Sequence, residues 1–216
     1  MSDILYIILG VISAYLIGSF PTAILYGRMY HGIDIRKSGS GNAGATNTFR
    51  VLGKKAGSIV MLIDVFKGWL ATSCTLVLLY FSVITQEHLD VYKLIFGLSA
   101  VAGHIFPVYE QFKGGKGIAT LLGMLMSIQI EAALICITVF CIVLLLSKYV
   151  SLGSMISTLA FPVMLLIIPR FRPNDPIIIV FGFMIFLLVV YTHKKNIKRL
   201  LRGEENKTLI RLRKKN

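Results

Sequence analysis

Apolar runs of membrane length alternate along this chain with short polar segments. Each run is expected to form a helix, because a backbone buried in lipid must satisfy its hydrogen bonds internally. The predicted spans are residues 4–26, 58–84, 91–108, 118–130, 131–146, 152–168 and 177–192. The fourth is short and fits a tilted or re-entrant segment. The pattern predicts an all-α integral membrane protein with seven transmembrane helices, forming a single membrane domain over residues 1–216.

Composition supports this class. The 216 residues are 56% hydrophobic and only 15% charged, which is far from an ordinary soluble domain. The first run has neither a basic leader nor a small-residue cleavage pattern, so it is expected to remain as a span. Cys74, Cys136 and Cys141 fall inside apolar runs without a CxxC pair or a histidine at ligand spacing. We therefore expect no disulfide framework, no metal site and no cofactor.

The net charge of +13 would suit a nucleic-acid partner, but its distribution indicates a membrane topology instead. Lys and Arg number six in residues 27–57, two in 109–117, one at Lys148 and ten in the tail after Thr192. The opposite side carries only Lys93, Arg170 and Arg172. This asymmetry predicts an outer N-terminus and a cytoplasmic C-terminus, with anionic lipid beside the basic tail.

The polar segment 27–57 contains a glycine-rich stretch with many donors. Gly39, Gly41 and Gly44 can take positive φ and turn their backbone N–H groups toward an anion. Neutral donors and cations surround them: Ser40, Asn42, Thr46, Asn47, Arg36, Lys37 and Arg50. The stretch predicts a phosphate pocket, although a glycine- and serine-rich segment alone is more often a flexible linker.

Three further features lie on the same predicted side. Gly114, Gly115 and Gly117 surround Lys116, which predicts backbone donors beside an ammonium, and no Walker A pattern is present. Lys67 lies one turn from Asp64, so it either pairs with that carboxylate or faces the phosphate pocket. The tail segment 193–206 contains two more site candidates, His193 and Asn196. Their i, i+3 spacing predicts that both lie on one helical face. The remainder of the tail is expected to form an amphipathic helix.

Three segments together resemble a known family. Ser38–Asn47, then Gly103–Pro107 with Phe112–Gly117, and finally His193–Glu204 resemble the three cytoplasmic motifs of bacterial acyl-phosphate-dependent glycerol-3-phosphate acyltransferases. The resemblance covers the whole chain in length, span count and motif order. It implies transfer of a fatty acyl group from acyl phosphate to the 1-hydroxyl of sn-glycerol 3-phosphate. The products would be lysophosphatidic acid and phosphate, at the first step of bacterial phospholipid synthesis.

The resemblance also implies roles, a location and partners. The catalytic candidates are Ser40, Arg50, His193 and Asn196. The candidates for binding substrate or phosphate are Gly39, Gly41, Asn42, Thr46, Asn47, Lys67, Gly114, Gly115, Lys116, Gly117 and Ser154. The site would face the cytoplasm from the inner membrane, and the soluble enzyme that makes acyl phosphate is a candidate partner. His193 either acts as a general base or only binds substrate, because a substrate phosphate can also take the proton.

Two alternatives of other classes remain. A transporter for a small anionic metabolite would use the basic segments as its cytoplasmic gate, but it should show internal repeats and polar groups near the bilayer midplane. A non-catalytic scaffold bound to anionic lipid would explain the tail and leave both glycine-rich segments without a role.

Overall fold

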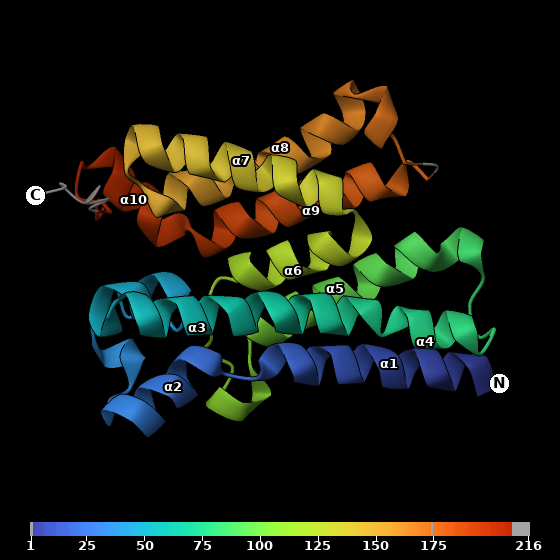
Figure 1. The fold of residues 1–216 in the computed structure, drawn as a ribbon, viewed down its shortest axis with the longest axis horizontal. Coiled ribbons are helices and arrows are strands. Elements are labelled where there is room, and N and C mark those ends of the chain that lie inside the picture. Colours follow the sequence, from blue (N-terminus) through green and yellow to red (C-terminus); the bar gives the residue numbers. More distant parts are fainter. Residues whose placement is uncertain (1, 174, 209–216) are drawn as a thin grey trace, which may run out of the picture. The chain divides into compact units, whose positions relative to one another are not determined.

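The computed structural model describes residues 2–173 and 175–208, which form α-helices joined by loops and 3₁₀ turns. The chain forms two compact units, Met1–Ile130 and Glu131–Asn216. The helices of the first are α1 (Ser2–Ser19), α2 (Thr22–His31), α3 (Ala45–Ser73), α4 (Thr75–Tyr80), α5 (Leu89–Ile105) and α6 (Ile118–Ile128). Its 3₁₀ helices are η1 (Ile35–Lys37), η2 (Gln86–His88) and η3 (Val108–Glu110). In this unit α1 packs along α5, and α3 packs along α6 (Figure 1).

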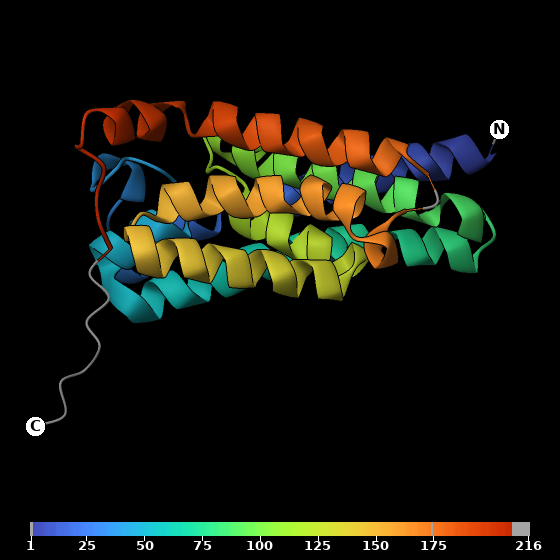
Figure 2. The ribbon, with the colours of Figure 1, turned by 90° about the horizontal axis from the view of Figure 1, so that it is seen from above.

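In its described residues, the second unit contains four helices and one 3₁₀ turn. They are α7 (Ile130–Ser147), α8 (Val150–Ile167), η4 (Pro169–Phe171), α9 (Ile177–Thr192) and α10 (Lys194–Leu201). α8 packs against α9. α9 and α10 meet at a bend of 64°. Figure 2 shows α10 as the short red helix that follows α9.

The helices have the length and apolarity of membrane spans. Five described stretches qualify, and the bent α9–α10 pair gives a sixth if it counts as one span. Helices therefore occupy all seven predicted ranges, and the all-α integral membrane class is confirmed. However, α6 has 11 residues, which is about 17 Å of helix against a hydrocarbon core of about 30 Å. The number of seven complete spans stays a prediction.

The polar segment 27–57 contains more helix than the sequence predicts. α2 continues to His31, and α3 already begins at Ala45. The reason is packing: this first part of α3 places Val51 and Leu52 against a buried cluster that includes Ile24 and Ile35. Gly53, with φ +87°, then interrupts the helical geometry before the membrane part of α3 begins.

Glycines let the helices of the first unit approach closely. A Cβ on Gly18 of α1 would lie 2.0 Å from the backbone oxygen of Ala100 on α5. In the α3–α6 pair, a Cβ on Gly68 would lie 2.1 Å from the backbone oxygen of Thr120. Small residues serve this purpose in membrane helices because lipid supplies no hydrophobic force between them, so close packing has to hold them together.

A buried ion pair supports the break between α1 and α2. Pro21 has no N–H to continue the helix, and the carbonyl of Phe20 accepts a hydrogen bond from Lys67 Nζ at 3.0 Å. Lys67 Nζ also lies 2.8 Å from Asp64 Oδ1, and the Thr22 hydroxyl donates to the same carboxylate oxygen at 2.9 Å. Asp64 is 1% and Lys67 5% exposed, so each charge depends on the other for compensation. The predicted mutual pairing of these two residues is confirmed.

The close contact of α1 with α5 can be tested with one substitution. Gly18→Leu should destabilise the protein by about 1–3 kcal/mol, because its side chain would meet α5 backbone that cannot move aside. The measurement is the thermal unfolding midpoint in detergent. Ser13→Leu, at an exposed position of the same helix, is the matched control. Equal midpoints for the two variants would contradict the packing argument.

The buried pair makes a second prediction. Lys67→Met should cost about 3–5 kcal/mol, since it leaves the Asp64 carboxylate buried without its cation. Lys55→Met, at an exposed position of α3, should leave the unfolding midpoint nearly unchanged. The double variant Asp64→Asn/Lys67→Met should recover part of the loss, because it removes both charges. A double variant less stable than Lys67→Met alone would rule this account out.

Candidate active site

Asn47 organises the loop between η1 and α3. Its side-chain amide donates to the carbonyls of Ile35 and Ser38, each at 3.0 Å, and its Oδ1 accepts from the Ser40 N–H at 2.8 Å. Gly39 and Gly41 have the expected positive φ, +62° and +73°. The side chain of Asn47 therefore holds this loop together through hydrogen bonds. The sequence predicted it as a donor for phosphate.

Two details of the first glycine-rich stretch differ from expectation. Gly44 is extended, with φ −147°, because it is the N-cap of α3 and needs no left-handed turn. The Ser40 hydroxyl lies 3.2 Å from Asn47 Oδ1, so it already has a hydrogen-bond partner within the loop.

The first turn of α3 adds donors that the sequence analysis missed. No side chain caps this helix, and the first N–H groups of a helix can bind an anion, favoured by the helix dipole. Thr46 and Arg50 are exposed on this turn and the next one, and Asn42 is half-buried just before it. Because α3 was expected to begin only after residue 57, sequence reasoning had no helix start to place here.

The second glycine-rich stretch folds back on the end of α5. The N–H groups of Gly114 and Gly115 donate to the carbonyls of Ile105 and His104, both at 3.1 Å. Their expected role as free donors is therefore wrong. What requires glycine is space, since a Cβ on Gly115 would lie 2.2 Å from the Nε2 atom of His104. Gly117 takes the left-handed conformation, with φ +81°, at the start of α6, and Lys116 before it is half-buried.

Both glycine-rich stretches and the buried ion pair border one small cavity in the first unit. Its lining includes Ala43, Lys67, His104, Gly114 and Gly115. The cavity measures about 10 Å³, which is room for one water molecule. Lys67 therefore pairs with Asp64 and borders this cavity, while its role beside a bound phosphate stays a prediction.

His104 is a member of this cluster that the sequence candidates did not include. Its Nδ1 lies 3.1 Å from the Thr120 hydroxyl and 3.7 Å from Asp64 Oδ1, and the residue is 7% exposed. The signal available in the sequence was a histidine placed at the polar end of an apolar run.

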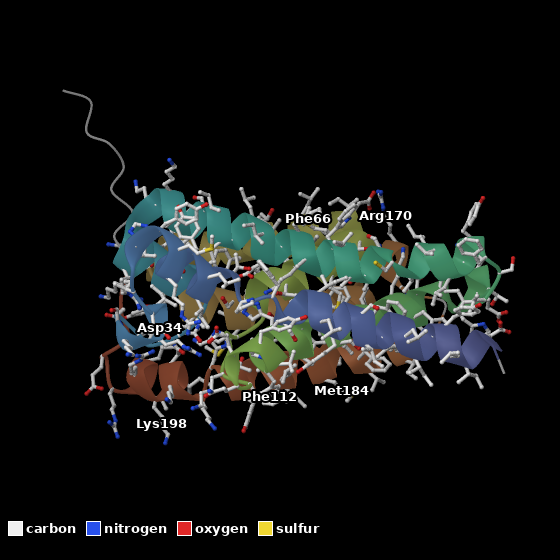
Figure 3. The ribbon with its side chains drawn as sticks, turned by 90° about the horizontal axis from the view of Figure 1, so that it is seen from below. Asp34, Phe66, Phe112, Arg170, Met184 and Lys198 are labelled. Atoms are coloured by element: carbon white, nitrogen blue, oxygen red, sulfur yellow. The ribbon has the colours of Figure 1, made fainter. Side chains whose placement is uncertain are left out.

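Arg36 does not contribute a free charge to the first loop. Its guanidinium lies 2.7 Å from the Asp34 carboxylate and 2.9 Å from the Glu110 carboxylate of η3. Figure 3 labels Asp34, in the loop between α2 and α3. The hydrogen bonds from Arg36 hold the pKa of the Asp34 carboxyl well below its usual range. Arg36 is therefore neutralised by carboxylates, while Lys37 and Arg50 are exposed.

In the second unit, His193 lies at the break between α9 and α10. It is the C-cap of α9 and the N-cap of α10, and it is 2% exposed. Its Nδ1 lies 2.8 Å from the carbonyl of Val189. Since a carbonyl only accepts, Nδ1 carries the hydrogen, and the lone pair of the neutral ring is on Nε2.

Asn196 and Ser154 are also buried, 6% and 2% exposed. The Asn196 amide donates to Glu205 Oε1 at 2.6 Å, and the Ser151 hydroxyl donates to the same atom at 2.9 Å. The Ser154 hydroxyl donates to the carbonyl of Val150 within α8. The chain therefore returns after α10, and Glu205 lies against Asn196, while the shared functional face of His193 and Asn196 stays a prediction.

The charged tail helix agrees with its expected amphipathic form in part. Lys194, Lys195 and Lys198 are exposed on α10, and Figure 3 shows Lys198 projecting outward. Leu201 is 84% exposed, as suits a residue at a lipid surface.

The sequence and the fold of this chain are similar to those of known proteins. The sequence profile described as glycerol-3-phosphate acyltransferase matches residues 8–203. A glycerol-3-phosphate acyltransferase of Chlorobium phaeobacteroides (strain BS1) is 42% identical, covering 90% of this chain and 93% of that protein. One of Bacillus subtilis (strain 168) is 40% identical, covering 91% of this chain and 95% of that protein.

Two solved structures share the fold. Both are crystal structures of PlsY, an integral membrane glycerol 3-phosphate acyltransferase. The glycerol 3-phosphate form has a TM-score of 0.82 and 34% identity, covering 94% of this chain and 96% of that one. The lysophosphatidic acid form has a TM-score of 0.77 and 33% identity, covering 94% and 95%. With a profile match over nearly its whole length, this chain belongs to the glycerol-3-phosphate acyltransferase family.

Proposed function

We propose that this protein transfers a fatty acyl group from acyl phosphate to the 1-hydroxyl of sn-glycerol 3-phosphate, releasing lysophosphatidic acid and phosphate. The observation that carries the proposal is the likeness, over 94% of the chain, to an acyltransferase crystallised in its glycerol 3-phosphate form. The reaction would be the first step of phospholipid synthesis in a bacterial cytoplasmic membrane.

The charge arrangement of the first unit suits an anionic substrate. Arg36 is already paired with carboxylates, whereas Arg50 is exposed one turn after the uncapped start of α3. We propose Arg50 and Lys116 as phosphate ligands, because a guanidinium and an ammonium beside backbone N–H groups form strong charge-assisted hydrogen bonds. The amides of the first turn of α3, including that of Thr46, would add neutral donors.

The chemistry asks little of the protein beyond position and charge. The glycerol hydroxyl oxygen attacks the acyl carbonyl carbon, the bond from that carbon to the phosphate oxygen breaks, and phosphate leaves with the bonding electrons. The hydroxyl proton passes to a base, for which His193 Nε2 and a substrate phosphate oxygen both have suitable lone pairs. Because acyl phosphate is already activated, orientation and stabilisation of the leaving phosphate supply most of the acceleration.

Glu205 gives Asn196 a defined role in this proposal. Glu205 accepts a hydrogen bond from the Asn196 amide at 2.6 Å, which fixes the orientation of this side chain, and we propose Asn196 as a substrate contact. Ser40, Ser154 and His193 are proposed as further substrate contacts.

The proposal includes a topology and two partners. Seven spans, an outer N-terminus and a cytoplasmic C-terminus would place the polar segments at the inner membrane surface, as the distribution of Lys and Arg predicts. Anionic lipid would lie beside the exposed lysines of α10, and the soluble enzyme that makes acyl phosphate would supply the donor.

An acyl-transfer assay tests the function directly. Purified protein in lipid receives labelled glycerol 3-phosphate together with palmitoyl phosphate, palmitoyl-coenzyme A or palmitoyl carrier protein. We expect lysophosphatidic acid from the acyl phosphate alone. Product from a thioester would contradict the proposed donor, and no product from any donor with folded protein would favour the transporter, to be tested by uptake into vesicles.

The phosphate ligands lead to a further prediction. Arg50→Ala and Lys116→Ala should each lower activity by about 100-fold or more, since each removes a charged partner of the leaving phosphate or of the phosphate of glycerol 3-phosphate. Lys55→Ala, also a cation on α3, should retain activity close to that of the unaltered protein. Turnover near normal in either variant, with the protein inserted and folded, would remove the argument for a phosphate clamp.

A further inference from the structure

Four charged side chains from two separate loops meet in one cluster, which we call the loop clamp: Arg28, Asp34, Arg36 and Glu110. Arg28 lies on α2, Asp34 caps η1, Arg36 lies in η1, and Glu110 ends η3. Three of these residues are near one another in sequence. Glu110 comes from the loop after α5, 82 positions beyond Arg28.

The Glu110 carboxylate is held at both oxygens. Arg28 donates from Nη1 to Oε1 at 2.7 Å and from Nη2 to Oε2 at 3.1 Å, and Arg36 Nη2 lies 2.9 Å from Oε2. Its side chain is only 10% exposed. A carboxylate this well buried depends on its partners, and two arginines in paired geometry are strong ones. Glu110 is thus firmly attached to the first loop.

Asp34 is the second carboxylate that faces the two arginines. Its carboxylate accepts from Arg36 Nη2 at 2.7 Å and from Arg28 Nη2 at 3.3 Å, and it also accepts from the backbone N–H of Arg36 at 3.0 Å. Two cations therefore face two anions, and the clamp as a whole is neutral. Its role is to hold structure, while the cations for substrate come from elsewhere.

The chain just after Glu110 is strained. Gln111 and Phe112 are consecutive non-glycine residues with φ +55° and +60°, a conformation that costs free energy and persists only where the surroundings impose it. The Phe112 N–H donates to the carbonyl of Pro107, and the Lys113 N–H donates to that of Glu110. Through this turn the chain reaches Gly114, Gly115 and Lys116.

We propose that Glu110 is a positioning residue for the phosphate site: it ties the strained turn that precedes Lys116 to the arginine pair of the first loop. The two glycine-rich segments are then held at a fixed separation, and Lys116 is presented to the anion in one arrangement. Glu110 does not touch the reacting atoms. This inference rests on the proposed function for its substrate, glycerol 3-phosphate, but the geometric part stands apart from it.

The kinetic test uses Glu110→Gln, which keeps the size of the side chain and removes its charge. KM for glycerol 3-phosphate should rise by about three- to tenfold, as expected for the loss of the two partly buried ion pairs of Glu110. The value of kcat and the KM for the acyl donor should stay within about twofold, because in this proposal the change acts on the binding of glycerol 3-phosphate alone. Glu87→Gln, the same change at an exposed position of η2, is the matched control.

A second variant separates the clamp from a general effect on folding. Arg28→Gln should raise the same KM, and the loss in Arg28→Gln/Glu110→Gln should be smaller than the sum of the two single losses, because both changes break the Arg28–Glu110 pair. Additive losses in the double variant, or a fall in kcat with an unchanged KM, would overturn the proposal.

A distance measurement works without any activity. Nitroxide labels at Lys37→Cys and Lys113→Cys, both at exposed positions, are introduced after replacing Cys74, Cys136 and Cys141 by alanine. Pulsed electron resonance should give a narrow distance distribution that broadens with Glu110→Gln. An unchanged distribution overturns the clamp, whereas absence of acyl transfer by the unaltered protein overturns the proposed function and leaves this readout valid.

Discussion

The buried pair of Asp64 and Lys67 is the interaction on which the architecture of the first unit depends. α1 ends before Pro21, and the Phe20 carbonyl accepts hydrogen bonds from the Thr22 N–H and from Lys67 Nζ, both at 3.0 Å. The aspartate in turn receives the Thr22 hydroxyl at the start of α2. Neither charge would be tolerated alone at this depth, so the break in the helix and the ion pair exist only together.

The pair also connects the helix break with the two glycine-rich segments. Lys67, Ala43 and Gly115 line the same small cavity, and His104 joins them from the end of α5. Hydrogen bonds inside the protein use many of the polar groups here, including the amides of Gly114 and Gly115. A rigid frame of this kind suits a reaction in which the substrate is already activated, because what it then needs is fixed orientation.

The sequence predicted what depends on local rules. Pro21 has no N–H to donate and favours a break in the helix, and the i, i+3 spacing of Asp64 and Lys67 allows them to pair on one helix. The long apolar runs predicted helices for a similar reason, since lipid leaves the backbone few alternatives. The family resemblance then identified the motifs; the comparisons confirm the family, and the roles of the motif residues stay predictions.

The sequence could not predict the contacts that form only when one segment of the chain folds back on another. Whether the N–H of Gly115 is free is decided by a carbonyl of α5, and whether Arg36 is free is decided by Glu110 from the next loop. Glu204 and Glu205 are adjacent and chemically alike, yet only Glu205 is buried and binds Asn196. The start of α3 was missed because its first residues resemble a loop in composition, while their packing on Ile24 and Ile35 makes them helical.

The most direct test of the account is the position of bound glycerol 3-phosphate, determined from an experimental structure of the protein in lipid. The account predicts density for the phosphate within hydrogen-bonding distance of the Arg50 guanidinium and the Lys116 ammonium, beside the first turn of α3. Phosphate density bound elsewhere, with both cations turned away from it, would contradict the proposed site.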